Sequence, residues 1–312
     1  MCLATKVMKK ITLALFLVFC FSASYSQWLW DYGFAVGASN YLGDIGGKEK
    51  TRRDFVADMK LAKTRWNVGA FARYKWRPKV SLKLAFDYLR LEGDDKLSSN
   101  LGRHYRNLNF RNDMFDLAFT GEWFFYENND LGNTYRYRNG FRAYVFAGVG
   151  GYYSNPKGFY NGKWTKLRPL QTEGVAYKSI GVNIPVGVGF YFTIEKKHRI
   201  GWELNWRKTF TDYLDDISGN FPDAPPSNKA SRDLSMRTSE LGQSARDENP
   251  GVYDYFQWGN KRGDPTHKDN YMTMSLSYSY VIRGKSSFYR GRYGHFFGKR
   301  SKRRVRKIRA KF

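Results

Sequence analysis

The sequence predicts an all-β protein: an eight-stranded antiparallel transmembrane β-barrel of the outer-membrane type, with long extracellular loops and a basic C-terminal periplasmic tail. Three observations lead to this fold class. An export signal opens the chain, apolar and polar residues alternate in eight segments, and short connections alternate with long ones between these segments. The predicted parts are a signal peptide at 1–26, a barrel at 27–283 and a tail at 284–312.

The first 26 residues have the composition of a secretory signal peptide. Two lysines precede an apolar run at 11–21, and small residues follow up to Ser26, after which we expect cleavage. The apolar run is shorter than the ~20 residues that a membrane-spanning helix needs. Both cysteines, Cys2 and Cys20, lie in this leader. The mature chain is therefore expected to contain no disulfide and no cysteine metal site.

Alternation with a period of two is clearest in two segments. In RWNVGAFARYKW, residues 65–76, the even-numbered positions from Trp66 to Trp76 are apolar, and the odd-numbered ones include Arg73. In IGVNIPVGVGFYFTI, residues 180–194, every even-numbered position is Ile, Val or Phe. Such a period places the apolar residues on one face of a strand. The same test predicts eight strands, near 30–41, 64–76, 81–92, 112–126, 141–152, 179–194, 199–210 and 270–283.

The connections between these strands alternate in length. The short ones lie at 77–80, 127–140 and 195–198, and the long ones at 42–63, 93–111, 153–178 and 211–269. Outer-membrane barrels have short periplasmic turns and longer extracellular loops. This assigns the long connections to the cell surface and both chain termini to the periplasm.

Alternation alone leaves two barrels open, because the apolar face fills the interior of a soluble barrel but faces lipid in a membrane barrel. Aromatic residues near strand ends on the apolar face, such as Trp66, Trp76 and Trp123, favour the membrane, where they would form an interfacial girdle. The polar face carries ionisable residues of both signs: Arg73, Asp87, Asp116, Glu122, Arg142, Glu203 and Arg207. Because eight strands leave room only for side chains, we expect these charges to pair across a lumen that is not a channel.

Positive charge is concentrated in the tail. The formal net charge of the chain is +25, and residues 284–312 contain twelve Lys or Arg and no acid. Export makes nucleic acid an improbable partner, so the alternatives are a solvated charge run or an anchor to anionic lipid or an acidic periplasmic protein. The candidate partner-binding residues are Arg300, Arg303, Arg304, Arg306, Lys307 and Arg309.

The stretch RKTFTDYLDDIS, from Arg207 to Ser218, places three carboxylates just after two cations. We expect Asp212 to cap the turn, and Asp215 and Asp216 to pair with rim cations such as Arg207 and Lys208. A calcium site is a weaker alternative, because the acids lack the spacing of a calcium loop. Catalysis would need a fixed histidine, and only His267 is positioned for that role.

The longest connection contains one segment of helical composition, SNKASRDLSMRTSELG at 227–242. Ser227 could cap it, Leu234, Met236 and Leu241 form a weak apolar stripe, and Gly242 would end it. The sequence therefore predicts a short helix over the barrel mouth.

Several motifs in order resemble those of the PorG family of small outer-membrane barrels. They are YVFAGVGGYYSNPKG (144–158), LRPLQTEG (167–174), IPVGVGFYF (184–192), RKTFTDYLDDISG (207–219) and WGNKRGDPTHKDNYM (258–272). The resemblance runs from about Trp28 to Arg283 and is strongest in the second half. The basic extension after the last strand departs from the smaller family members.

This resemblance implies a non-enzymatic part of the type IX secretion system, which exports proteins and, in some bacteria, gliding adhesins. Its implied partners are outer-membrane lipid and a periplasmic ring built from a lipoprotein and its partner, with no cofactor, metal, nucleic acid or small-molecule substrate. The rim motifs then form a network at the loop bases: Arg207, Asp212, Asp215, Asp216, Asn155 and Glu173. The alternative is a small surface enzyme or receptor that uses the Asp cluster and His267.

Overall fold

The computed structural model describes residues 30–46, 61–131 and 139–282. These residues fall almost entirely in one compact unit, Trp30–Val281. The predicted signal peptide at 1–26 and the basic tail at 284–312, including its six candidate partner-binding residues, lie outside the described residues.

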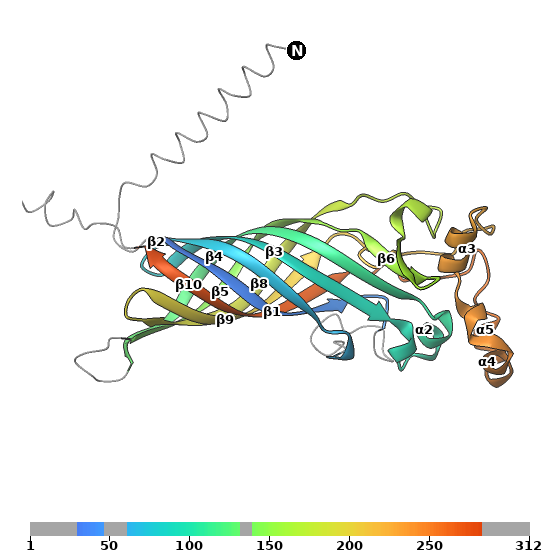
Figure 1. Cartoon of the computed structure of the whole chain (residues 1–312), viewed down its shortest axis with the longest axis horizontal. Coiled ribbons are helices and arrows are strands. Elements are labelled where there is room, and N and C mark those ends of the chain that lie inside the picture. Colours follow the sequence, from blue (N-terminus) through green and yellow to red (C-terminus); the bar gives the residue numbers. More distant parts are fainter. Residues whose placement is uncertain (1–29, 47–60, 132–138, 283–312) are drawn as a thin grey trace, which may run out of the picture. The chain divides into compact units, whose positions relative to one another are not determined.

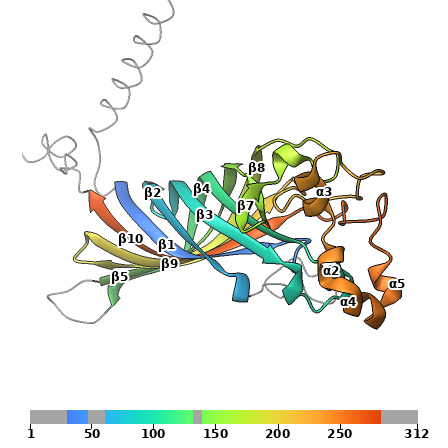
Figure 2. The same ribbon diagram turned by 45° about the vertical axis from the view of Figure 1, so that its right-hand side comes forward.

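Eight antiparallel strands form a closed barrel. They are β1 (Trp30–Leu42), β2 (Arg65–Arg77), β3 (Val80–Asp94), β4 (Asn109–Leu131), β5 (Asn139–Tyr153), β8 (Ile180–Ile194), β9 (His198–Thr209) and β10 (Asn270–Ile282). The strand order runs β3-β2-β1-β10-β9-β8-β5-β4, and pairing of β3 with β4 closes the sheet on itself. Figure 2 shows the tilted strands curving round to this closure.

All eight predicted strands are confirmed, because the period of two in the sequence continues through each of them. The turn between β8 and β9 is tight: Lys197 N–H donates to the carbonyl of Ile194 at 3.1 Å, and both intervening residues have positive φ, 50° at Glu195 and 59° at Lys196. Two left-handed residues match the type I′ turn, whose twist suits an antiparallel pair. The opposite ends of the strands lead into the long connections.

The orientation of the two strand faces decides between a soluble and a membrane barrel. Along β8, Ile180, Val182 and Ile184 are exposed, while Asn183 is buried in the lumen. The other strands repeat this arrangement, with an exposed belt that includes Phe34, Trp66, Phe86, Leu117, Phe119, Trp123, Val149, Ile200 and Leu276. An apolar belt of this extent marks a surface that contacts a membrane. The fold is therefore an outer-membrane-type barrel.

Charged side chains fill the lumen as pairs. Arg73 lies 3.1 Å from Asp31 and 2.7 Å from Glu122, and Arg207 lies 2.6 Å from Asp87. Lys83 and Glu203 also pair directly across the lumen. A cavity lined by Lys83, Asp87, Glu203 and Arg207 measures about 30 Å³, which is about the room of one water molecule. The predicted cross-strand pairing is confirmed.

Glycines make room for aromatic rings inside the barrel. Three inward aromatic residues of β5 each lie opposite an inward glycine of β8: Tyr144 opposite Gly189, Phe146 opposite Gly187 and Tyr152 opposite Gly181. A Cβ atom at Gly189 would lie 2.7 Å from the Tyr144 ring, and one at Gly181 2.3 Å from the Tyr152 hydroxyl. The rings therefore lie across the glycines and narrow the lumen further.

Towards the long connections the same positions of β3 still point inward, but the inward residues are now apolar and the outward ones charged. Leu89 and Leu91 of β3 point inward and are fully buried, whereas Arg90 and Glu92 between and after them point outward. The outward charges form pairs, with Arg90 2.6 Å from Asp113. The apolar interior of this loop-side section comprises Tyr41, Ile45, Leu89, Leu91, Leu108, Phe110, Met114, Tyr152, Leu214, Ile217 and Tyr271. This section has the build of a water-soluble protein, so the membrane ends below it.

The connections on this side contain further elements, which lie together beyond one end of the strands (Figure 1). They are η2 (Leu61–Lys63), η3 (Asp95–Leu97), α2 (Leu101–Arg106), β6 (Pro156–Tyr160), β7 (Lys163–Lys166), η4 (Arg168–Leu170), α3 (Lys229–Ser235), η5 (Thr238–Leu241), α4 (Gly242–Glu248) and α5 (Pro250–Tyr253). Within the described ranges, no helix has the length and apolar character needed to cross a membrane.

The single helix predicted at 227–242 is wrong in its extent. The helix α3 is capped by Asn228, whose side chain accepts from the Ala230 N–H at 2.9 Å, and not by Ser227. Its end comes at Met236, where the backbone is extended, and Gly242 begins α4.

Candidate functional site

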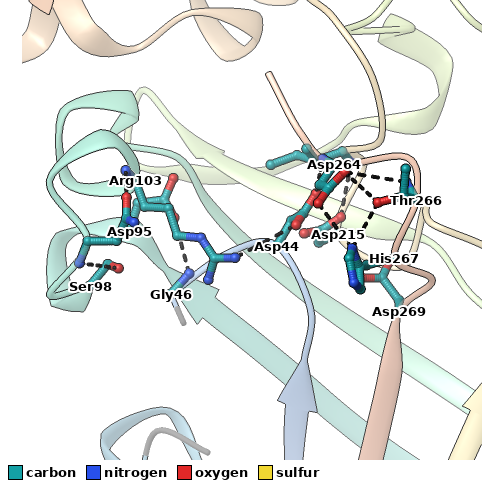
Figure 3. Close-up of polar contacts among 12 residues, drawn as sticks. Asp44, Gly46, Asp95, Ser98, Arg103, Asp215, Asp264, Thr266, His267 and Asp269 are labelled. Carbon is teal, nitrogen blue, oxygen red and sulfur yellow. Dashed lines mark hydrogen bonds and ion pairs between the residues drawn. The ribbon is translucent and has the colours of Figure 1, made fainter. Parts of the chain in front are cut away.

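The stretch that follows β9 forms the centre of a buried polar cluster at the base of the loops. Asp212, Asp215 and Asp216 are each at most 2% exposed. We use the name rim network for this cluster and its partners: Tyr41, Asp44, Arg106, Glu173, Asp212, Asp215, Asp216, Arg262 and Asp269. Figure 3 shows how Asp44, Asp215 and Asp269 approach one another from three separate segments of the chain.

Tyr41 joins two carboxyl groups through a single hydroxyl. Its oxygen lies 2.7 Å from Asp215 Oδ2 and 2.5 Å from Asp269 Oδ1, and it accepts a hydrogen bond from the Asp44 N–H at 3.0 Å. A tyrosine hydroxyl has one proton to donate. It can satisfy only one of the two carboxylates, so the other must be protonated and donate to the tyrosine oxygen. The Asp215–Tyr41–Asp269 group therefore retains a shared proton.

The environment of these two carboxyls favours such a proton. Burial raises the pKa of Asp215, and the nearby charge of Asp44 raises it further. Burial also raises the pKa of Asp269, with added contributions from Asp215 and Asp212. Both groups also cap the turn, because Asp215 accepts from the Ile217 N–H and Asp269 from the Leu214 N–H, each at 3.0 Å.

Asp216 is held by hydroxyl donors. Its backbone φ is +72°, a conformation that Asp tolerates better than most residues. The carboxylate accepts from the Thr172 hydroxyl and from the Tyr177 hydroxyl, the latter at 2.5 Å. Arg262 Nη2 is 3.9 Å away. Burial raises the pKa of Asp216 to about 6, although Arg262 and the two hydroxyls oppose the shift.

Two buried arginines connect the loops to one another. Arg262 Nη1 donates to Glu173 Oε1 at 3.0 Å and to the Asp216 carbonyl at 2.6 Å. Arg106 is paired with Asp95 at 2.8 Å and donates to the carbonyl groups of Asp44 and Arg262 at 2.8 and 2.6 Å. Each guanidinium thus bonds several loops at once, which fixes the loop bases relative to the strands.

Asp212 is the exception in this network. Within the described part of the chain, both of its carboxylate oxygens are buried without a hydrogen-bond partner. Burial raises the pKa of Asp212 to about 7, and the nearby charge of Asp44 adds to the shift. The cap predicted for Asp212 is therefore wrong. The turn N–H groups of Ser218 and Gly219 are instead bound by the Glu173 carboxylate, at 3.0 and 3.1 Å.

The prediction that Asp215 and Asp216 pair with rim cations such as Arg207 is also wrong. Arg207 occupies an inward position of β9 and pairs with Asp87, deeper in the lumen. The cation beside Asp216 is Arg262. Asn155 joins the cluster only through its backbone: its N–H donates to Asn112 Oδ1 at 3.0 Å, and Asn112 donates to the Leu214 carbonyl at 2.7 Å.

The histidine considered for catalysis lies beside the network. His267 Nδ1 is 3.0 Å from Asp264 Oδ2 and 2.9 Å from the Thr266 hydroxyl (Figure 3). Across the residues that the structure describes, no group of three or more His, Asp or Glu has an arrangement that could hold a metal ion.

Comparison with known proteins identifies the family of the chain. Residues 9–232 match the model of the family described as Domain of unknown function (DUF6089), which covers more than half of the chain. The chain belongs to this family. No curated protein matches this DUF6089 protein in sequence.

Solved structures similar to this DUF6089 protein include three bacterial surface proteins. Ail, the attachment invasion locus protein of Yersinia pestis, solved with the heparin analogue sucrose octasulfate, is 9% identical, with a TM-score of 0.35 over 81% of this chain and 99% of Ail. The N-terminal β-barrel domain of Pseudomonas aeruginosa OprF is 9% identical, with a TM-score of 0.35 over 82% and 100%. Neisserial surface protein A is 5% identical, with a TM-score of 0.34 over 81% and 97%.

Proposed function

We propose that this DUF6089 protein is a non-catalytic outer-membrane component of the type IX protein secretion system, and that it anchors the periplasmic ring complex to the outer membrane. The observation that carries the proposal is the sealed lumen between an apolar outer belt and a fixed loop base. Such a barrel can hold a position in the membrane, but it offers no path through it. The ordered PorG-like motifs at 144–158, 207–219 and 258–272 supply the link to secretion.

The burial of the three rim aspartates favours anchoring over the alternative function, a surface enzyme or receptor. A catalytic carboxylate has to reach its substrate, whereas Asp212, Asp215 and Asp216 are buried. The hydrogen bonds of Asp215 and Asp216 go to loop backbone and to neighbouring side chains. These contacts suit a structural role in which the two aspartates hold the loops together.

The ring would meet the side of the barrel opposite to the long loops. Two of the three short connections there carry paired cations, Arg77 and Lys79 in the first and Lys196 and Lys197 in the last. The basic tail continues from the last strand on the same side of the predicted topology. An acidic surface on the ring lipoprotein or its partner would complement these charges.

The test is copurification of the tagged full-length protein from mild detergent, with secretion measured in the same strains. Deletion of 284–312 should release the ring proteins from the outer-membrane fraction and abolish secretion, while the barrel still inserts. Replacing the six candidate arginines and lysines of the tail by Gln should have the same effect at full length. A tail of the same composition in scrambled order is the matched control for charge alone.

Unchanged ring recovery and unchanged secretion after the deletion would exclude the tail as the anchor. If, in addition, the full-length protein brings down no ring component, the assignment to the secretion system itself is wrong.

A further inference from the structure

A second feature of the loop end is a cavity of about 260 Å³ between α2 and the 255–264 segment. Its volume corresponds to roughly eight or nine water molecules at ~30 Å³ each. This is room for one small ring and its substituents. Half-exposed side chains, Tyr255 and Lys261, lie at its edge, and the buried Arg106 and Arg262 lie at its base.

The four cations that line this cavity fall into two kinds. Arg106 and Arg262 are held in the rim network through bonds of 2.6–3.0 Å. Arg103 and Lys261 are not. The nearest carboxylate oxygens lie 3.8 Å from Arg103 Nη2 and 3.6 Å from Lys261 Nζ, beyond hydrogen-bond distance.

Arg103 has an unused donor as well. Among the described residues its Nη1 is buried and has no hydrogen-bond partner. A buried charged donor left unpaired is costly, and an anionic group in the cavity would satisfy it. Figure 3 shows the Arg103 side chain extending toward Asp44.

The other residues that line the cavity indicate which further groups a ligand would need. Tyr255 presents a half-exposed ring, supported by Phe256 at a centroid distance of 5.6 Å. Asp44 and Asp264 add carboxylate oxygens, which can only accept hydrogen bonds when ionised. A site for a bare phosphate would gain nothing from these acceptors. A hydroxylated ring with an acidic substituent would contact all three kinds of lining residue: the cations, the aromatic ring and the carboxylates.

We propose that this cavity binds an acidic sugar residue. The CH face of the ring packs on Tyr255, the acid group lies between Arg103 and Lys261, and ring hydroxyls donate to Asp44 and Asp264. The same chemistry is available on a glycolipid of the membrane and on a free glycan. This binding site is independent of the anchoring function proposed above.

The test uses the full-length protein in lipid nanodiscs with D-glucuronate as the probe, measured by saturation-transfer NMR and calorimetry. We expect glucuronate to bind at least tenfold more tightly than glucose, which lacks the acid, and than inorganic phosphate, which lacks the ring. Arg103→Gln and Lys261→Gln should each weaken glucuronate at least tenfold. Lys229→Gln, which removes an exposed cation of the same connection away from the cavity, should leave binding unchanged.

Arg103→Lys separates charge from folding, because it should retain binding that Arg103→Gln loses. In one experiment glucuronate is added free in solution, and in the other it is the headgroup of a lipid in the nanodisc. The form that binds more tightly shows whether the sugar belongs to a free glycan or to a glycolipid. The proposal is overturned if both experiments fail at millimolar probe, if glucose or phosphate binds as well as glucuronate, or if Lys261→Gln behaves like Lys229→Gln.

Discussion

The membrane section of the barrel and its loop-side section are parts of the same strands, yet they are built on opposite rules. In the membrane section of β3, Lys83 and Asp87 point into the lumen, while Leu84 and Phe86 face outward. A few residues further along, the leucines are inside and the charged residues are outside. The side-chain period does not change at this boundary; the solvent does.

This difference shows which interactions stabilise each section. Lipid outside the membrane section accepts apolar side chains, so the lumen holds the charged groups, and those must be paired because water is excluded. Water surrounds the loop-side section, so burial of its apolar cluster supplies the stability there. Ion pairs are therefore essential for the stability of the membrane section, whereas those on the outside of the loop-side section contribute little to stability.

The largest expected effect separates these two kinds of ion pair. Arg73→Ala leaves Glu122 buried without its arginine and Asp31 with Arg199 alone, and it should lower the free energy of unfolding by about 3–5 kcal/mol. Arg90→Ala removes the outer partner of Asp113 and should cost about 0–1 kcal/mol. Urea titration of the barrel refolded into lipid vesicles measures both.

A compensated variant serves as the control for Arg73. Replacing Arg73 by Met together with Glu122→Gln removes this buried pair and leaves Asp31 paired with Arg199, so it should recover most of the lost stability. Equal costs for Arg73→Ala and Arg90→Ala would contradict the distinction between the two sections.

Most of the fold could be predicted from the sequence, because the period of two is a local signal. The sequence of β3 also contains the exchange of polarity between its two faces, where LAFDY is followed by LRLEG. What the sequence left open was the side on which lipid lies. That question was answered by the exposure of the Ile180, Val182 and Ile184 face, which is a property of the closed sheet.

The rim network could be predicted only in part. The Asp cluster and Glu173 were recognised as a group, but Tyr41 comes from the end of β1, and Arg106 and Arg262 from loops, and their approach depends on closure of the barrel. The choice of Arg207 as the rim cation was wrong for a different reason. Proximity in sequence favoured Arg207, but alternation along β9 places its side chain in the lumen, beside Asp87. Arg262 lies in a motif, 258–272, that the sequence had already singled out.

The second-largest expected effect is a dependence of stability on pH in the loop-side section. In the unfolded chain these carboxyls titrate near pH 4, whereas the pKa is about 6 for Asp216 and about 7 for Asp212 in the folded protein. The folded state thus keeps protons that the unfolded state releases between pH 4 and 7. Stability of the loop base must therefore fall as pH rises through this window.

Amide exchange of residues 212–219, corrected for the intrinsic rate, should accordingly be faster at pH 8 than at pH 5. Asp212→Asn should slow the exchange at pH 8 by at least about tenfold, because each pKa unit of the shift corresponds to a factor of ten. Asp264→Asn is the control: the pKa of Asp264 is lowered to about 2, chiefly by hydrogen bonds and in spite of burial, so this group does not titrate in the window. A pH dependence unchanged in Asp212→Asn would refute the assignment.

The smallest effect lies at the opposite end, in the turn between β8 and β9. Lys196 has φ +59°, which costs a non-glycine residue about 1 kcal/mol, so Lys196→Gly should stabilise the barrel by about 0.5 kcal/mol after the entropy of glycine is subtracted. Lys197, outside the left-handed region, is the matched control, and Lys197→Gly should destabilise by a similar amount. Equal destabilisation by both would contradict the turn geometry. If Lys196→Gly raises stability in the urea titration but lowers recovery of the ring proteins, the strained lysine is retained for its charge at the partner surface. The short turns then serve binding at some expense of stability.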